Sequence, residues 1–328
     1  MSLPIALDAM GGDFAPEEII KGARRAVDEL GLNITLVGVP DRMGDPLGLE
    51  VVTCSEVIEM DDEPGSSVRK KKDSSLVRAA ELVRDGKASA FVSAGNTGAT
   101  MASALLRLGR LPGVLRPCIA TPIPNPGRPP STMVDAGANA ECSPEMLVQF
   151  AKLAGAFASA RFGIASPTVG LLTIGEESTK GTPLVKETHE LLADDSGINF
   201  FGNVEGHDLI PSPVDVIVTD GFTGNVALKT LEGSLQFVFA TLLEAINTND
   251  ETKAAGQVLF PYLTPTVTTL SAEYQGGAML LGLNGICVIS HGASNDTAIM
   301  NALRVAAEMD AAGVVEKMRT AIRPDQDQ

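Results

Sequence analysis

The chain has 328 residues, 44% of them hydrophobic, and a formal net charge of −16. This length allows a large core, either in one α/β unit or in two packed halves. The acidic field makes nucleic acid a poor partner, because its phosphates would be repelled. No run approaches the roughly 18–20 uninterrupted apolar residues of a membrane span. The N-terminal segment lacks the basic start of a signal peptide, so we expect a cytoplasmic protein.

The predicted elements alternate along the chain. Short runs rich in β-branched residues predict strands at residues 4–8, 34–39, 50–54, 88–94, 118–123, 132–136, 168–174, 214–220 and 285–290. Residues 17–30 have helical periodicity, and Ser143 before Pro144 and Thr182 before Pro183 are typical helix starts. The alternation predicts a three-layer α/β/α fold with a largely parallel, Rossmann-like sheet. We expect a single domain over residues 1–322.

One segment breaks the alternation. Residues 245–275 carry prolines beside a group of apolar side chains and predict a helical, apolar excursion from the domain. Residues 323–328 predict a disordered tail.

Small polar turns follow most of the predicted strands, at residues 8–13, 93–99, 135–139, 174–181, 202–208, 219–225 and 290–295. In parallel α/β sheets the ligand crevice lies outside the carboxyl ends of the strands. Glycine there lets backbone N–H groups approach a ligand, and a helix that begins at such a turn favours an anion. Together the turns predict one crevice suited to phosphate or an oxyanion. Taken singly, each is also compatible with ordinary turn chemistry.

Several common sites are excluded. The chain lacks GxxxxGK[ST], GxSxG and HExxH, and no GxGxxG follows a strand, so the P-loop, serine-hydrolase, zincin and usual nicotinamide classes are unsupported. The four cysteines are scattered and form no disulfide or metal pattern. We therefore expect neither a metal nor a cofactor, and a nucleophile that belongs to the substrate.

The turns, in their order along the chain, resemble the signature segments of the PlsX family of phosphate acyltransferases. The segments are LDAMGGDFAP, SAGNTGA, VDAGAN, GLLTIGEESTKG, GNVEGHD, VTDGFTGNVALKTLEG and GGAMLLGLNGICVISHGASN. The resemblance implies reversible transfer of a long-chain fatty acyl group from acyl carrier protein to inorganic phosphate, which yields acyl phosphate for phospholipid biosynthesis. It also implies a homodimer with a fold of the isopropylmalate dehydrogenase and phosphotransacetylase type.

With this resemblance, we predict three catalytic residues. Lys180 would supply positive charge, Asn225 an amide donor, and His291 would orient phosphate or protonate the leaving thiolate. The alternatives are a solvated loop lysine at 180 and a structural turn histidine at 291. Further phosphate or substrate contacts are predicted at Asp8, Gly11, Gly12, Asn96, Thr97, Gly98, Asn139, Asn203, Gly221 and Gly224.

Two further segments predict partners. Arg69, Lys70, Lys71 and Lys72 are consecutive cations in an acidic chain, which suits docking of the acidic acyl carrier protein or, alternatively, a plain solvated surface. The apolar group within 245–275 would contact the membrane surface peripherally or pack across a dimer interface. Lys253 is the single cation of residues 244–275, so attraction to anionic lipid would be weak.

Two rival functions stay open on the sequence. The first is a phosphotransacetylase-like enzyme that uses acyl-CoA as the donor. The second is a phosphate-binding protein without enzymatic activity. The acyl donor that supports phosphate-dependent turnover separates all three functions.

Overall fold

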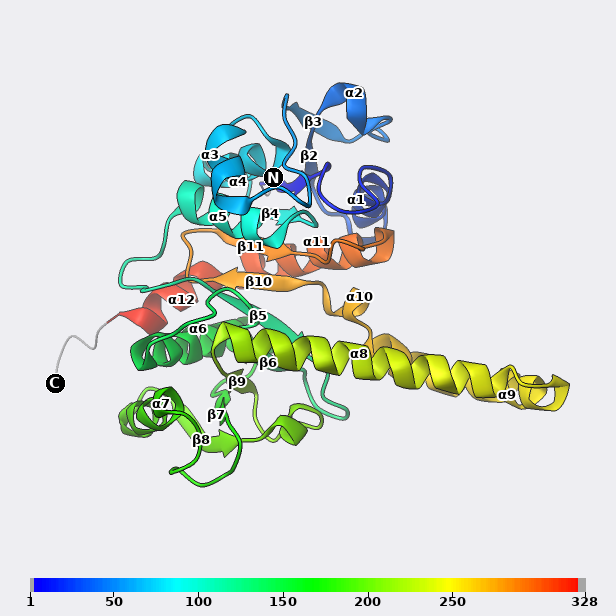
Figure 1. Cartoon of the computed structure of the whole chain (residues 1–328). Helices are drawn as coiled ribbons and strands as arrows, with labels where there is room; N and C mark the ends of the chain where they lie inside the picture. The colour runs from blue at the N-terminus through cyan, green and yellow to red at the C-terminus, as the bar shows by residue number, and fades with distance from the viewer. Residues whose placement is uncertain (1–2, 324–328) are drawn as a thin grey trace.

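The computed structural model describes residues 3–323, apart from the side chains of residues 265–267, 269 and 272. An eleven-stranded sheet runs through the whole body and is covered by helices on both faces (Figure 1). The predicted tail at 323–328 lies, beyond its first residue, outside the described residues. The predicted α/β/α class is confirmed.

The strands are β1 (Ile5–Asp8), β2 (Ile34–Gly38), β3 (Glu50–Thr53), β4 (Ala90–Ser93), β5 (Cys118–Ile123), β6 (Ser131–Val134), β7 (Thr168–Leu172), β8 (Asn199–Val204), β9 (Val216–Val218), β10 (Ala278–Leu281) and β11 (Ile286–Ile289). The helices are α1 (Glu17–Leu30), α2 (Pro40–Met43), α3 (Pro64–Lys70), α4 (Ser75–Arg84), α5 (Thr97–Leu108), α6 (Pro144–Phe162), α7 (Pro183–Asp194), α8 (Gly221–Ile246), α9 (Asp250–Leu270), α10 (Ala272–Gln275), α11 (Asp296–Ala311) and α12 (Val314–Ile322), with a short 3₁₀ turn at Gly206–Leu209.

The sheet consists of two parallel blocks that run in opposite directions. Its order is β3-β2-β1-β4-β11-β10-β5-β6-β9-β7-β8. The strands from β3 to β11 are parallel to one another, and so are those from β6 to β8. Between the blocks, the pairs β11–β10, β10–β5 and β5–β6 are all antiparallel. This odd number of reversals places the carboxyl ends of the two blocks at opposite edges of the sheet.

These two edges are named here by their strands. The first edge is formed by the carboxyl ends of β1, β4 and β11, and the second edge by those of β6, β9 and β7.

Each predicted strand is present. The sequence missed β8 and β10. β10 is made of alanine, methionine and leucine, which favour helices, and it becomes a strand because it pairs with a neighbour on either side.

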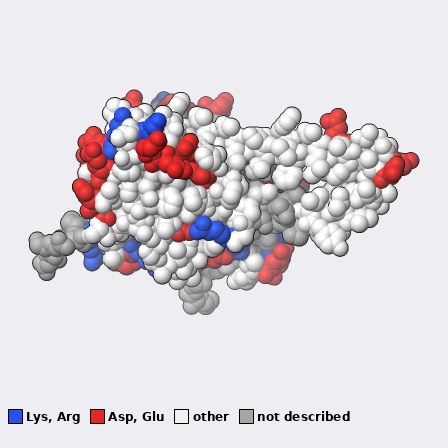
Figure 2. Space-filling view, turned by 90° about the horizontal axis from the view of Figure 1, so that it is seen from below, with Lys and Arg blue, Asp and Glu red and all other residues white. Residues whose placement is uncertain are grey.

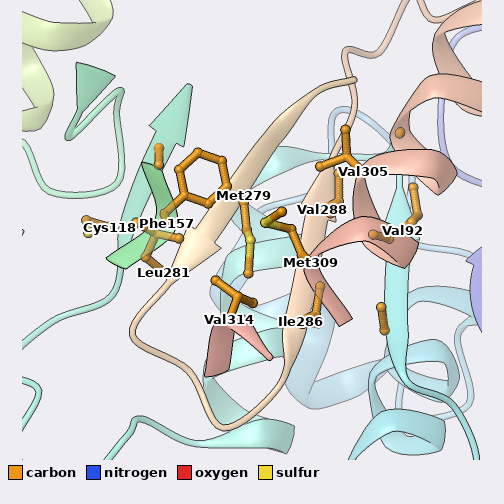
Figure 3. Packing of buried hydrophobic residues seen from close by; sticks show 14 of the residues in the cluster. Val92, Cys118, Phe157, Met279, Leu281, Ile286, Val288, Val305, Met309 and Val314 are labelled. Atoms are coloured by element: carbon orange, nitrogen blue, oxygen red, sulfur yellow. The ribbon is translucent and has the colours of Figure 1, made fainter. Parts of the chain in front are cut away.

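The core fills both faces of the sheet. On one face α1, α6, α11 and α12 pack on the strands, and on the other α4 and α5 do so. Figure 3 shows the middle of the first face, where Met279 and Val288 of the sheet meet Phe157 and Met309 of the helices. Burial of this apolar surface is the main force that holds the two blocks in one body.

The helix starts agree with the predicted caps. The side chain of Ser143 accepts a hydrogen bond from the Met146 N–H, and that of Thr182 accepts one from the Val185 N–H. These bonds satisfy amide groups that the first turn of a helix leaves without partners.

The helices α8 and α9 form an arm that projects from the body (Figure 1). Much of its surface is exposed and apolar, with Phe237 71% and Tyr262 78% exposed. The face of the arm that Figure 2 shows carries little charge except at acidic positions toward its tip. α8 is the one described helix long and apolar enough to cross a bilayer by length and composition alone. α8 begins on the body, where Leu228 and Leu231 pack against the core, and its exposed apolar part, which includes Phe237 and Leu242, already lies before residue 245.

Candidate functional site

The turns that follow β1, β4 and β11 meet at the first edge. A Cβ added at Gly11 would lie 2.8 Å from the backbone nitrogen of Gly95, so only glycine allows these two turns to touch. The Asp13 N–H donates to the Gly292 carbonyl oxygen at 2.8 Å, which joins the third turn. Gly12 has a φ of +121° and lies against Gly292. The three turns form one continuous floor.

Asp8 holds this floor from below. Its side chain is buried, and it accepts hydrogen bonds from the Met10 N–H at 3.2 Å and from the Ser93 hydroxyl at 2.8 Å. Burial raises the pKa of this carboxyl above its ordinary value, while hydrogen bonds from Ser75, Ser93 and the turn backbone act against that rise. The structure places Asp8 as a support for the turns. The sequence missed Ser93 as its partner, although Ser93 ends the neighbouring strand.

The N-terminus of α5 opens on the same floor. Asn96 caps it by accepting from the Ala99 N–H at 3.0 Å, and its amide donates to the carbonyls of Met60 and Asp62. The Asn96 side chain is therefore committed to the protein. The N–H groups of Thr97 and Gly98 have no hydrogen-bond partner among the described residues, as expected for a first helical turn. They are available to an anion at this end of the helix dipole.

His291 is the exposed titratable side chain of the third turn. Its Nδ1 accepts a hydrogen bond from the Ala293 N–H at 3.1 Å. A neutral imidazole in this position carries its proton on Nε2, which is free to donate. The Ser290 and Ser294 hydroxyls, 2.7 Å apart and buried, brace the turn from behind.

At the second edge, Asp135 organises the turn after β6. Its Oδ1 accepts from the Gly137 and Ala138 N–H groups, and its Oδ2 accepts from both the backbone and the side-chain amide of Asn139 at 2.8 Å each. The Asn139 amide also donates to the Pro117 carbonyl at 2.8 Å. Both amide protons of Asn139 are thus used within the protein.

Gly221 and Gly224 allow α8 to pack on that turn. A Cβ at Gly221 would lie 2.6 Å from the Asn139 carbonyl oxygen, and one at Gly224 would lie 2.0 Å from that of Asp135. Asn225, one position on, is exposed beside Gly137, and its amide has no hydrogen-bond partner among the described residues. Of the predicted asparagines, Asn225 is the one whose amide is open to a ligand.

Lys180 lies in the turn after β7, half exposed and 4.0 Å from Glu177. Asn203 proves to be a buried residue of β8. Its amide donates to the carbonyls of Gly175 and Glu177, and its Oδ1 lies 2.9 Å from Nδ1 of His189. Asn203 therefore fixes the shape of the turn that carries Lys180.

The expectation of one crevice lined by all the turns is wrong for the single chain. The first edge holds Asp8, Gly11, Gly12, Asn96, Thr97, Gly98 and His291, and the second holds Asn139, Lys180, Asn203, Gly221, Gly224 and Asn225. The physical reason is the reversal of direction between the blocks. Sequence alternation predicts strands and helices but does not reveal which strand pairs are antiparallel.

The two edges differ in their fitness for an anion. The helix at the first edge has the neutral Asn96 as its cap, so its dipole is uncompensated. The helix at the second edge is capped by Asp220, whose carboxylate accepts from the Thr223 N–H at 2.9 Å and already supplies negative charge there. An incoming phosphate therefore meets no capping carboxylate at the start of α5, whereas it meets one at the start of α8.

The predicted basic cluster lies beside the first edge, at the end of α3, which packs against α5. Arg69, Lys70 and Lys72 are exposed, and none has an ion pair among the described residues. Lys71 differs, because it pairs with Asp62 and donates to the Val57 carbonyl at 2.9 Å. Three of the four cations are thus open to a partner.

In the described chain, no group of three or more His, Cys, Asp or Glu side chains could hold a metal ion.

Comparisons with known proteins agree with this fold. Residues 3–317 match the family model described as fatty acid synthesis protein. A phosphate acyltransferase of Halothermothrix orenii is 44% identical, covering 98% of this chain and 99% of its own. One of Pelotomaculum thermopropionicum is 46% identical, with 98% and 95% covered.

Solved structures show the same fold at low identity. A phosphotransacetylase of Streptococcus pyogenes has a TM-score of 0.62 at 17% identity, with 96% of this chain and 94% of that one covered. A branched-chain phosphotransacylase of Enterococcus faecalis has a TM-score of 0.61 at 15% identity, with 94% and 99% covered.

Fold and family together define the class of this protein, which is an acyltransferase. Within that class, the chain belongs to the fatty acid synthesis protein family, whose curated relatives are phosphate acyltransferases. Its activity is therefore the transfer of an acyl group to phosphate.

Proposed function

We propose that the first edge is the site where a long-chain fatty acyl group passes from acyl carrier protein to inorganic phosphate. The observation that carries the proposal is the free Thr97 and Gly98 N–H pair, at a helix start with a neutral cap, beside three open cations. The product would be acyl phosphate for phospholipid biosynthesis, and the reaction would be reversible.

The reaction needs few protein groups. A phosphate oxygen held at the start of α5 attacks the thioester carbonyl carbon, a C–O bond forms, and the C–S bond then breaks. Near neutral pH phosphate is already partly a dianion, so positioning replaces a dedicated base. The leaving thiolate has a basicity close to that of a free cysteine, so it can depart as the anion, and the Nε2–H of His291 is suited to donate a hydrogen bond to it.

The carrier protein would dock on Arg69, Lys70 and Lys72. An acidic partner approaching a chain of net charge −16 needs a local positive surface to steer it. Because α3 packs on α5, a carrier bound there stands beside the proposed phosphate position. The prosthetic arm would then enter along the floor of the first edge.

Lys180 and Asn225 stay predictions for the same reaction. They lie at the second edge, so they can contribute to chemistry at the first only if a second copy of the chain, or a large movement, brings them there. We propose a homodimer in which the apolar arm of α8 and α9 supplies interface area. Sedimentation of a Phe237→Glu chain tests this, with monomers as the expected result.

The rest of the arm suits a shallow peripheral contact at the inner face of the membrane of a cytoplasmic enzyme. Its charge argues for weak attraction to anionic lipid, since Lys253 faces Asp250 at 4.0 Å and Glu251 is exposed. Flotation with vesicles of neutral and anionic lipid tests this placement, and binding that depends strongly on anionic lipid would contradict it.

The deciding experiment measures acyl phosphate from purified protein, phosphate and either palmitoyl-acyl carrier protein or palmitoyl-CoA. We expect phosphate-dependent product with kcat/KM at least about tenfold higher for the carrier protein, a difference of about 1.4 kcal/mol. Equal or faster turnover of the CoA thioester would favour the phosphotransacetylase-like alternative. Phosphate binding without any product would favour the non-enzymatic one.

A further inference from the structure

An apolar groove of about 400 Å³ opens between the start of α1 and the segment that follows β2. Ile20 and Met43, both almost fully buried, line it together with Pro16 and Leu47. The other lining residues are Glu17, Lys21, Arg42, Gly44 and Asp45. This volume lies within the range of small-molecule sites in proteins.

The two cations that line the groove are already paired with carboxylates. Lys21 bonds Glu17 at 2.8 Å and Glu18 at 3.1 Å, and Arg42 pairs with Glu59 at 3.1 Å. An anionic ligand would find no open counter-charge in these two side chains. What they leave for contact is methylene and apolar surface, which suits a hydrocarbon ligand.

Leu47 is held in a conformation that leucine avoids. It is the one non-glycine residue with positive φ in the described chain, at 52°, yet it is 41% exposed. The Asp45 side chain fixes this turn by accepting from the Leu47 N–H at 2.8 Å. Asparagine or glycine would adopt this backbone at lower cost. A strained, exposed leucine on a groove wall indicates that its side chain is needed there.

The groove lies next to the floor of the first edge. Ala15 N–H donates to the Gly12 carbonyl at 3.2 Å, so the floor turn leads within a few residues to Pro16 on the groove wall. Underneath, the sulfur atoms of Met10 and Met43 both lie over Gly38, at 3.3 Å and 2.8 Å from the position of an added Cβ. Met10 belongs to the floor turn and Met43 to the groove.

From these observations we infer that the groove binds the hydrocarbon tail of the acyl substrate, with the reacting carbonyl at the first edge. The inference rests on the proposed acyl transfer and adds the subsite that sets chain-length preference. Methionine and leucine side chains adapt to a flexible chain, and each buried methylene improves affinity by roughly fourfold.

Two readouts test the groove. One is the equilibrium binding of hexadecyl and butyl phosphonate, used below the concentration at which they form micelles. The other is kcat/KM for palmitoyl and butyryl thioesters of acyl carrier protein. We expect Leu47→Asn to weaken hexadecyl phosphonate binding by about tenfold and to leave butyl phosphonate binding unchanged. Asparagine suits the positive φ, so this chain should fold at least as well as the parent. Leu47→Met should keep the preference of the parent for the palmitoyl over the butyryl thioester, measured as kcat/KM.

The matched control is Leu115→Asn, which changes a leucine of similar exposure (43%) outside the groove. It should leave both affinities unchanged. If Leu47→Asn binds hexadecyl phosphonate as tightly as the parent, the groove is not the site of the acyl tail. The same conclusion follows if Leu115→Asn loses as much affinity for hexadecyl phosphonate as Leu47→Asn. Binding that depends on Leu47 in a protein that makes no acyl phosphate would instead support the groove and refute the proposed reaction.

Discussion

His291 is the side chain at the first edge best placed to meet a substrate, because its Nε2 is free while its Nδ1 is held by the Ala293 N–H. We expect His291→Ala to lower kcat for acyl phosphate formation by at least about tenfold, or 1.4 kcal/mol, with little change in stability. His207→Ala is the control, since His207 is also exposed but follows β8 in the other block. If kcat of the His291→Ala enzyme stays within twofold of the parent value, His291 has only a structural role.

Asp8 should make the free energy of unfolding depend on pH. Burial raises the pKa of its carboxyl in the folded chain above the ordinary value of 3.8. The folded state then holds the proton more tightly than the unfolded state. The stability that Asp8 contributes is therefore full below the ordinary pKa and is lost as the pH rises through the folded pKa.

Urea denaturation between about pH 4 and pH 7 measures this loss. Relative to Asp8→Asn, which does not titrate, the parent should lose free energy of unfolding as the pH rises across that range. Parallel curves for the two chains would mean that the Asp8 carboxyl titrates alike in both states.

The asparagines show what residue patterns can and cannot predict. Asn96 and Asn139 occur in turns of the predicted kind, and the turns exist. Their amides, however, are used by carbonyls that are distant in sequence, 36 residues away for Met60 and 22 for Pro117. Such partners appear only once the chain is folded. The sequence therefore predicted the turns correctly but could not separate supporting asparagines from an open one such as Asn225.

At the scale of elements, the start of α8 depends on close packing. Gly224→Ala would place a methyl group 2.0 Å from the Asp135 carbonyl oxygen, so we expect a loss of about 3 kcal/mol in the free energy of unfolding. Gly233 in the same helix has nothing within 4 Å of an added Cβ. Gly233→Ala should add about 0.5–1 kcal/mol, because alanine is the better helix former.

Urea denaturation of both variants checks this pair. Equal effects would show that α8 does not rest on the turn at 135–139 in solution. The contrast is useful because both changes are the same substitution in one helix, which removes helix propensity as an explanation for the difference.

The cations at the end of α3 are expected to speed the association of acyl carrier protein with the enzyme. Reversing Lys70 and Lys72 to Glu should raise the KM for acyl carrier protein by about tenfold at low salt. Lys71 is left intact because it holds Asp62. The effect should shrink toward 1 M salt, where the Debye length is about 3 Å, and kcat should change little.

The matched control reverses Lys186 and Lys229, two exposed lysines of the other block, and so makes the same change in net charge. A similar rise in KM for this control would show that global charge, and not the cluster, governs the encounter. An acyl-pantetheine donor, which has no acidic protein surface, should react equally with all three enzymes.

At the scale of the whole molecule, the layered α/β/α architecture could be predicted because alternation and helix caps are local in sequence. The division into two edges could not. It depends on β10, whose residues give no strand signal, and on antiparallel pairing of β5 with both of its neighbours. A local sequence pattern does not determine whether a strand pairs in parallel or antiparallel with a strand that is distant in sequence.

Binding of phosphate at the first edge can be observed in a crystal structure of the protein with phosphate. We expect phosphate within hydrogen-bond distance of the Thr97 and Gly98 N–H groups, with His291 beside it. Phosphate bound instead between Lys180 and Asn225 at the second edge, with the start of α5 unoccupied, would contradict this expectation.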